Sequence, residues 1–212
     1  MTPRFAVWLI IPVIAFLVWQ YNYFGNRVVK TQRTEWHDTS GVDFEKKGNT
    51  LVVGMYNIEN LFDTIDDPRI DDNEFLPTAK SEWTGARYKI KLQQIAKVIA
   101  AMNDGKSPDV LGLCEVENKN VLEDLIREPQ IAGRFQIVHY DSPDQRGIDV
   151  ALLYKPDKFK VISSKPINVS LQHDTNFKTR DILWVTGLVG KKDTLNVFVN
   201  HWPSRRGGMA SG

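Results

Sequence analysis

The chain has 212 residues, which suits one medium-sized domain with an appendage. Apolar residues make up 42% of it and charged residues 25%, which excludes a chain that is disordered throughout. Its 27 basic and 26 acidic side chains leave a formal net charge of +1. That balance argues against tight, indiscriminate binding to duplex DNA, although nucleic acid remains a possible substrate.

The first 26 residues are predicted to be a membrane anchor or a signal. The stretch from Phe5 to Asn26 carries no charge, and a run of this length can cross a hydrocarbon layer of about 30 Å as a helix. Its end, Trp19 to Phe24, has aromatic residues where a cleaved signal has small ones, which favours an uncleaved anchor over a signal or a buried core helix. We therefore expect a membrane-anchored or exported protein, and the flanking charges leave its orientation open.

Residues 27–49 are polar and lack periodicity, so they are interpreted as a linker. The domain that follows alternates strands and helices in its first part. Strands are predicted at Leu51–Tyr56 and Val110–Cys114, which are apolar on both faces, and helices at Tyr88–Met102 and Val116–Arg127.

The second part of the domain is a series of strands, predicted at 135–140, 148–154, 159–169, 182–189 and 194–200. Together the two parts predict an α/β (α+β) fold of mixed sheets with helices outside. The single cysteine, Cys114, allows no intrachain disulfide and is interpreted as a buried thiol within its strand.

Three polar side chains follow predicted buried strands: Asn57, Glu115 and His201. Strand ends of open α/β sheets form the crevice in which ligands bind, and a carboxylate there is costly unless it is paired or holds a metal. Each also has a structural interpretation: Asn57 as a turn former, Glu115 as a charge at the start of a helix, and His201 as a surface histidine.

Four segments resemble, in order, the motifs of the endonuclease/exonuclease/phosphatase superfamily of deoxyribonuclease-like metal-dependent phosphoesterases. They are 56–61 (YNIENL), 109–118 (DVLGLCEVEN), 146–154 (RGIDVALLY) and 200–208 (NHWPSRRGG). The resemblance implies a four-layer sandwich of two mixed β-sheets with flanking helices, and it assigns residues 50–212 to the N-terminal portion of such a domain.

The resemblance also implies a divalent-metal site. Glu115 would be the main ligand of Mg²⁺ or Mn²⁺, both of which prefer carboxylate oxygen. Glu59 falls where some members place a second carboxylate. Asn57 would orient the phosphate and the nucleophile, and His201 would stabilise charge in the transition state.

Three arginines are candidates for holding substrate phosphate: Arg146, Arg180 and Arg205. A solvated charge or a structural ion pair is the alternative for each. Asp149 interrupts an apolar strand, where it would support an arginine or the histidine, or serve as a structural partner.

An acidic segment, Asp63–Glu74, contains six acids in twelve residues, but Ile65 and Pro68 stand where a calcium-binding EF-hand loop needs an acid or amide and a glycine. We interpret it as an exposed loop beside the site that disfavours long duplex DNA.

The family's Gly-Asp-x-Asn-like and Asp-His motifs do not follow residue 208, so the chain is expected to be C-terminally truncated and inactive by itself. The predicted function of the full-length protein is hydrolysis of phosphoester bonds, as a nuclease or a phosphatase of small molecules or lipid headgroups. A membrane-tethered inactive remnant or binding module is the alternative. No protein partner is inferred.

Overall fold

The computed structural model describes residues 50–170 and 178–202. The chain divides into two units, Met1–Thr50 and Leu51–Gly212, and all the helices and strands below belong to the second. The predicted anchor (1–26), the linker (27–49) and Arg205 lie outside the described residues, so these assignments stay predictions. Within the residues that are described, no helix is both long and apolar enough to cross a membrane.

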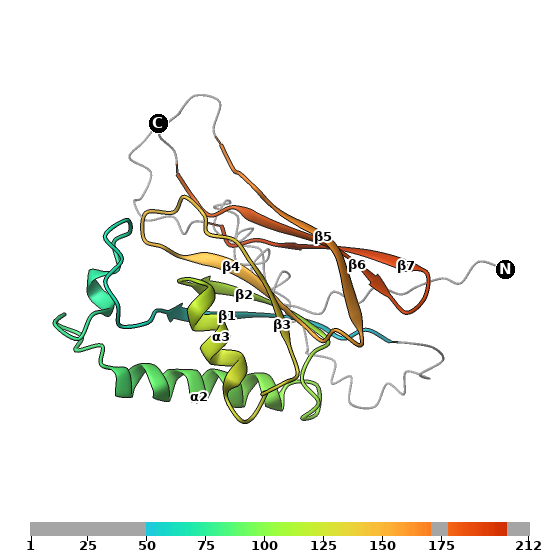
Figure 1. Ribbon diagram of the computed structural model, residues 1–212, viewed down its shortest axis with the longest axis horizontal. Helices are drawn as coiled ribbons and strands as arrows, with labels where there is room; N and C mark the ends of the chain where they lie inside the picture. The colour runs from blue at the N-terminus through green and yellow to red at the C-terminus, as the bar shows by residue number, and fades with distance from the viewer. Residues whose placement is uncertain (1–49, 171–177, 203–212) are drawn as a thin grey trace, which may run out of the picture. The chain divides into compact units, whose positions relative to one another are not determined.

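The first sheet has four strands in the order β1-β2-β4-β3 (Figure 1). They are β1 (Val53–Leu61), β2 (Val110–Val116), β3 (Gln136–His139) and β4 (Asp149–Tyr154). β1 runs parallel to β2, whereas β4 is antiparallel to both of its neighbours, β2 and β3. The two carboxyl ends of this parallel pair meet at the same edge of the sheet, which is where open α/β sheets commonly bind ligands.

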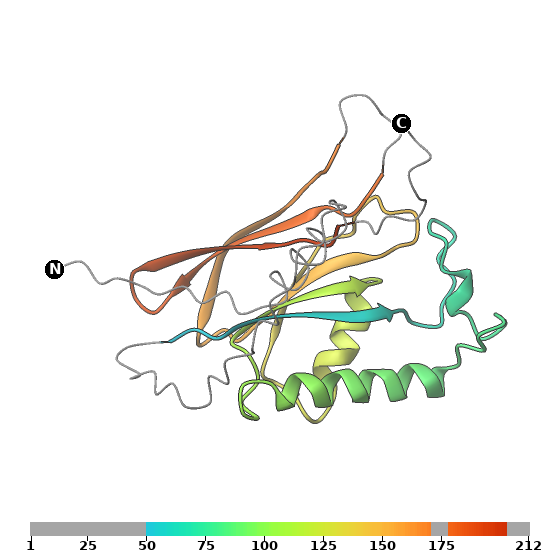
Figure 2. The ribbon, with the colours of Figure 1, turned by 180° about the vertical axis from the view of Figure 1, so that it is seen from behind.

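Two helices cover one face of this sheet (Figure 2). α2 (Gly85–Ala101) is capped by the Thr84 hydroxyl and α3 (Lys119–Arg127) by the Asn118 amide oxygen, each of which accepts a hydrogen bond from a backbone N–H of the first turn. A short 3-10 helix, η2 (Asn73–Phe75), precedes α2. Leu92, Ile95 and Ile99 recur at helical spacing and are buried against the sheet.

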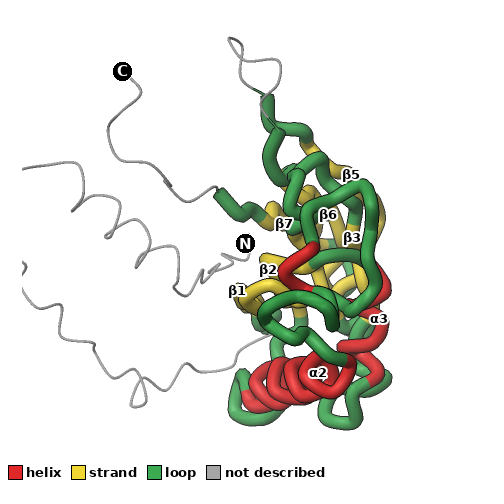
Figure 3. Tube along the Cα trace, turned by 90° about the vertical axis from the view of Figure 1, so that its left-hand side faces the viewer, coloured by secondary structure: helices red, strands yellow, loops and turns green. Residues whose placement is uncertain are grey.

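The second sheet is antiparallel, in the order β5 (Phe159–Ile167), β6 (Ile182–Val189), β7 (Asp193–Val199). It packs on the other face of the first sheet, so that helices, first sheet and second sheet form successive layers (Figure 3). Gly112 permits the close approach at the centre, because a Cβ there would lie 2.8 Å from the Met55 sulfur and 3.3 Å from Val199.

The predicted α/β sandwich of two sheets with flanking helices is confirmed, and the described residues supply three of its layers. Only the first sheet is mixed, because β5, β6 and β7 follow one another through antiparallel connections. β1 and β2 also extend beyond their predicted ends, to Leu61 and Val116. Asn57 and Glu115 therefore lie inside the strands, in segments where the pairing is irregular.

Candidate active site

The carboxyl ends of β1 and β2 lie side by side and both depart from regular strand geometry. Their register is continuous up to the pair Asn57–Cys114 and shifts before the pair Leu61–Val116. Within the shift, Glu59, Asn60 and Glu115 have φ values of 57°, 58° and 66°. A left-handed backbone costs a residue other than glycine on the order of 1 kcal/mol or more, so this edge of the sheet stores strain.

The irregular backbone surrounds the Glu115 carboxylate with hydrogen-bond donors. The Asn57 side-chain nitrogen donates to Glu115 Oε1 over 3.1 Å, and the Asn60 N–H donates to Oε2 over 3.0 Å. The Asn57 amide is itself oriented, because its oxygen accepts from the Glu59 N–H over 2.9 Å. The structure thus joins Asn57 and Glu115, which are far apart in the sequence, through a direct contact.

His201 completes this group from the second sheet, just after β7. Its Nε2 lies 3.5 Å from Glu115 Oε1, and its Nδ1 is buried with no hydrogen-bond partner among the described residues. Burial lowers the pKa of His201, and the Arg180 charge lowers it further, whereas Glu115 acts in the opposite direction. The lowered pKa favours a neutral imidazole, which can either accept or donate a proton.

Arg180 and Arg146 lie near His201 and share the carboxylate of Asp144, a residue that no sequence motif indicated. Asp144 is buried, and its oxygens lie 3.3 Å from Arg180 Nε and 3.7 Å from Arg146 Nε. Arg180 is also buried and donates from Nη1 to the His201 carbonyl over 3.4 Å. The pKa of Arg180 is lowered by burial, and the Asp144 charge opposes this effect.

The local signal for Asp144 was weak, because a Pro-Asp pair normally indicates only a turn. Asp144 does form that turn: its carboxylate accepts from the Arg146 N–H over 2.9 Å, and its carbonyl accepts from the Gly147 N–H. Its pairing with Arg180 depends on a segment 36 residues further along the chain, and nothing in the local pattern indicates it.

Two of the predicted site residues differ from this group in their surroundings. The Glu59 side chain is exposed, and its carboxylate, like that of Glu115, raises the pKa of Lys91. Asp149 is buried, accepts from the Ser142 N–H over 3.0 Å and lies 3.1 Å from His139 Nε2. Of the roles considered for Asp149, the structural partnership is therefore the one this geometry supports.

The donors around Glu115 are compatible with a divalent cation. A carboxylate has about four lone-pair sites, and Asn57, Asn60 and His201 face three of them at Glu115. Magnesium keeps several waters and is commonly held through only one or two carboxylates. Elsewhere in the described part of the chain, ligand atoms of His139, Asp141 and Asp149 also lie within 4.8 Å of one another. There, however, His139 Nε2 is hydrogen-bonded to Asp149 over 3.1 Å, whereas Nδ1 lies 3.9 Å from Asp141, so the two imidazole nitrogens face different carboxylates.

Residues 52–212 match the Endonuclease/Exonuclease/phosphatase family, so the chain belongs to this family, as its motifs predict. No curated protein matches the sequence. Similar solved structures include a humanized TDP2 of D. rerio, at 14% identity and a TM-score of 0.48, with 75% of this chain and 50% of that chain covered. Another is an endonuclease/exonuclease/phosphatase family protein of Bacteroides thetaiotaomicron, at 15% identity and a TM-score of 0.45, with 70% and 48% covered. The chain thus spans about half the length of these proteins.

Proposed function

We propose that the protein hydrolyses phosphoester bonds with the help of a divalent cation, Mg²⁺ or Mn²⁺, held by Glu115. The observation that carries this proposal is the convergence of Asn57, Glu115 and His201 at one strand edge, beside Arg146 and Arg180. Family membership supports the same class of reaction.

Each side chain has a role that its position suits. Asn57 orients the Glu115 carboxylate, and Arg146, half exposed, can make two parallel hydrogen bonds to a phosphate. Arg180 holds the His201 backbone in place and adds positive charge close to the reacting group. A cation at Glu115 supplies polarisation of the phosphoryl group and activation of a water molecule.

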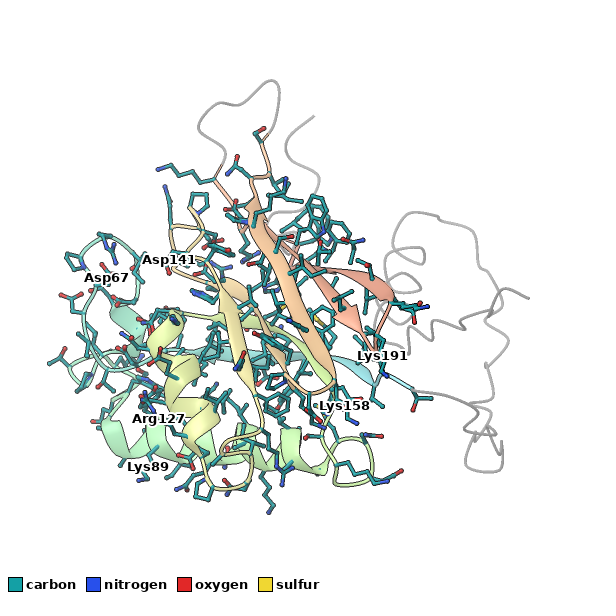
Figure 4. All side chains as sticks on the ribbon, turned by 45° about the vertical axis from the view of Figure 1, so that its right-hand side comes forward. Asp67, Lys89, Arg127, Asp141, Lys158 and Lys191 are labelled. Atoms are coloured by element: carbon teal, nitrogen blue, oxygen red, sulfur yellow. The ribbon has the colours of Figure 1, made fainter. Side chains whose placement is uncertain are left out.

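The acidic segment Asp63–Glu74 favours a small or single-stranded substrate over long duplex DNA. It packs on the loop that carries Arg146, because the Asp71 N–H donates to the Gln145 carbonyl over 2.8 Å and Ile70 lies against Gly147. Figure 4 labels Asp67 in this segment and Asp141 in the neighbouring loop. Negative charge at this position repels the phosphates that flank a reacting bond in a polyanion.

The decisive experiment measures hydrolysis of a chromogenic phosphodiester by the full-length protein with Mg²⁺ or Mn²⁺. We expect activity to be abolished by EDTA, and Glu115→Gln to reduce it at least ~100-fold, since a neutral amide binds a hard cation poorly. Glu123→Gln on α3 is the matched control and should leave the rate unchanged, because Glu123 makes only surface ion pairs. Activity that survives both EDTA and Glu115→Gln would exclude the metal role.

A second series compares rates on a chromogenic phosphomonoester, single-stranded DNA and duplex DNA at two salt concentrations. We expect duplex DNA to be the poorest substrate at low salt and to gain most as salt screens the acidic segment. If duplex DNA is cleaved fastest at low salt, the substrate preference proposed here is wrong, even though the phosphoesterase assignment would stand.

A further inference from the structure

Lys91 reaches the candidate active site from the helical layer. It lies in the second turn of α2, and α2 begins beneath the carboxyl end of β1 (Figures 1 and 2). The Lys91 ammonium group donates a hydrogen bond to the backbone carbonyl of Glu59. The side chain is half-buried, which lowers the Lys91 pKa, whereas the nearby Glu59 and Glu115 carboxylates raise it.

The Glu59 carbonyl belongs to the strained segment that surrounds Glu115. Glu59 and Asn60 are consecutive left-handed residues, and neither is a glycine. Their N–H groups point into the site and donate to Asn57 Oδ1 and Glu115 Oε2. Strain of this kind persists only where surrounding contacts over-determine the conformation. Asn57 and Glu115 hold the segment from the site, and Lys91 holds it from the side of the helix.

Lys91 is itself supported by packed aromatic side chains. Its ammonium lies 5.9 Å from the centroid of the Trp83 ring, and the Trp83 indole N–H donates to the Phe62 carbonyl over 3.1 Å. Phe75 stacks on Phe62 at a centroid distance of 4.1 Å. This packing restricts the conformational freedom of the Lys91 side chain. The ammonium group is thus held by the aromatic ring on one side and by the Glu59 carbonyl on the other.

We propose that Lys91 is a positioning residue: by holding the Glu59–Asn60 segment, it keeps Glu115 in the orientation that binds the divalent cation. The inference rests on the proposed metal-dependent function and adds to it a residue of α2 that touches neither substrate nor the reacting atoms.

Removing the Lys91 ammonium has two effects on the affinity for the divalent cation, and these effects have opposite signs. The direction of the measured change therefore tests the proposal. A positive charge near Glu115 repels a cation, so if the charge alone mattered, its removal would tighten metal binding. If Lys91 acts by positioning, its removal releases the segment and weakens binding. Loss of groups that orient metal ligands typically costs 10- to 100-fold in affinity.

The experiment titrates Mn²⁺ into the purified full-length protein by isothermal calorimetry, without substrate. We expect Lys91→Met to weaken binding at least ~10-fold and Lys91→Arg, which keeps the charge and the donors, to restore it to within ~3-fold of the wild type. Lys89→Met is the matched control, because Lys89 is an exposed lysine of the same helix (labelled in Figure 4). The affinity of this variant for Mn²⁺ should equal that of the wild type. Thermal unfolding verifies that each variant is folded, and Lys91→Gln replaces Lys91→Met if the latter is not.

Equal or tighter Mn²⁺ binding by folded Lys91→Met would overturn the positioning role and leave the proposed function intact. If the wild-type protein shows no Mn²⁺ binding that Glu115→Gln removes, the proposed function fails, and this inference fails with it. The two failures are distinguishable because the first is seen in the Lys91 variants alone, and the second in the comparison of the wild type with Glu115→Gln.

Discussion

The parallel pair β1–β2 is regular along its first part and irregular at its carboxyl end. From Val53–Val110 to Asn57–Cys114 the residues pair one to one, and Leu111 and Leu113 are fully buried between the helices and the second sheet. Beyond this point Glu59, Asn60 and Glu115 adopt left-handed backbone. Here the Asn60 N–H and the Asn57 side chain donate hydrogen bonds to the Glu115 carboxylate. The same two strands thus stabilise the fold at one end and accept strain at the other, where the polar groups gather.

The largest effect is expected from Arg180→Met, a change next to the irregular end rather than within it. This change leaves the buried Asp144 without its main partner, and breaking a buried pair typically costs roughly 3 to 5 kcal/mol of unfolding free energy. Urea denaturation measures that loss, and phosphodiester hydrolysis should fall as well. The double variant Arg180→Met with Asp144→Leu should regain stability without regaining activity. A stable but still active Arg180→Met protein would contradict the role of this pair.

In the regular part, Leu111→Ala should reduce stability without changing the chemistry. Leu111 is fully buried in the core beneath α2 and α3, and a large-to-small change there costs roughly 2 to 5 kcal/mol because a cavity remains. Well below the unfolding temperature, the rate of hydrolysis should stay close to that of the wild type. A large loss of activity in the folded variant would mean that the two ends of the strand pair are coupled.

Glu117 directly follows the irregular end of β2, where its N–H donates to the Leu61 carbonyl, and the effect of replacing it should depend on pH. Burial, together with Asp63, raises the pKa of Glu117 from 4.5 to about 7, although the Asp63 N–H that donates to it acts in the opposite direction. An acid whose pKa is raised by folding contributes stability below its unfolded pKa, and this contribution is lost as the pH rises through about 7.

Replacing Glu117 with glutamine should remove this dependence. We expect Glu117→Gln to be more stable than the wild type above pH 7, by roughly 1 to 3 kcal/mol after allowance for solvent screening, and to differ little from it below pH 4.5. Thermal unfolding across this pH range makes the comparison. A constant difference at all pH values would show that the charge of Glu117 is not its origin.

The smallest effect concerns Cys114, the last residue of the regular part. Burial raises the pKa of its thiol to about 12, and the sulfur lies 3.6 Å from the Asn200 carbonyl. We expect a thiol reagent to modify Cys114 only at the rate of unfolding, and completely in denaturant. Rapid labelling of the native protein would show that the two sheets separate at this position.

The sequence by itself determined the elements, their order and the family, because apolar periodicity and four ordered motifs are local properties of the chain. It also singled out Asn57, Glu115 and His201, because each interrupts or follows an apolar run, and the structure brings these three side chains together. The strand ends were placed too early, because a polar residue was interpreted as the end of a strand whose pairing in fact continues past a shift in register.

Only the tertiary structure decided which side chains meet. Asp144 and Lys91 resemble an ordinary turn residue and a solvated helix residue, and they acquire their contacts from segments distant in the sequence. Asp149 was recognised as unusual, but its partners His139 and Ser142 were not predictable from its strand. The physical reason is that hydrogen bonds and ion pairs depend on positions in space, and these arise from how sheets and helices pack.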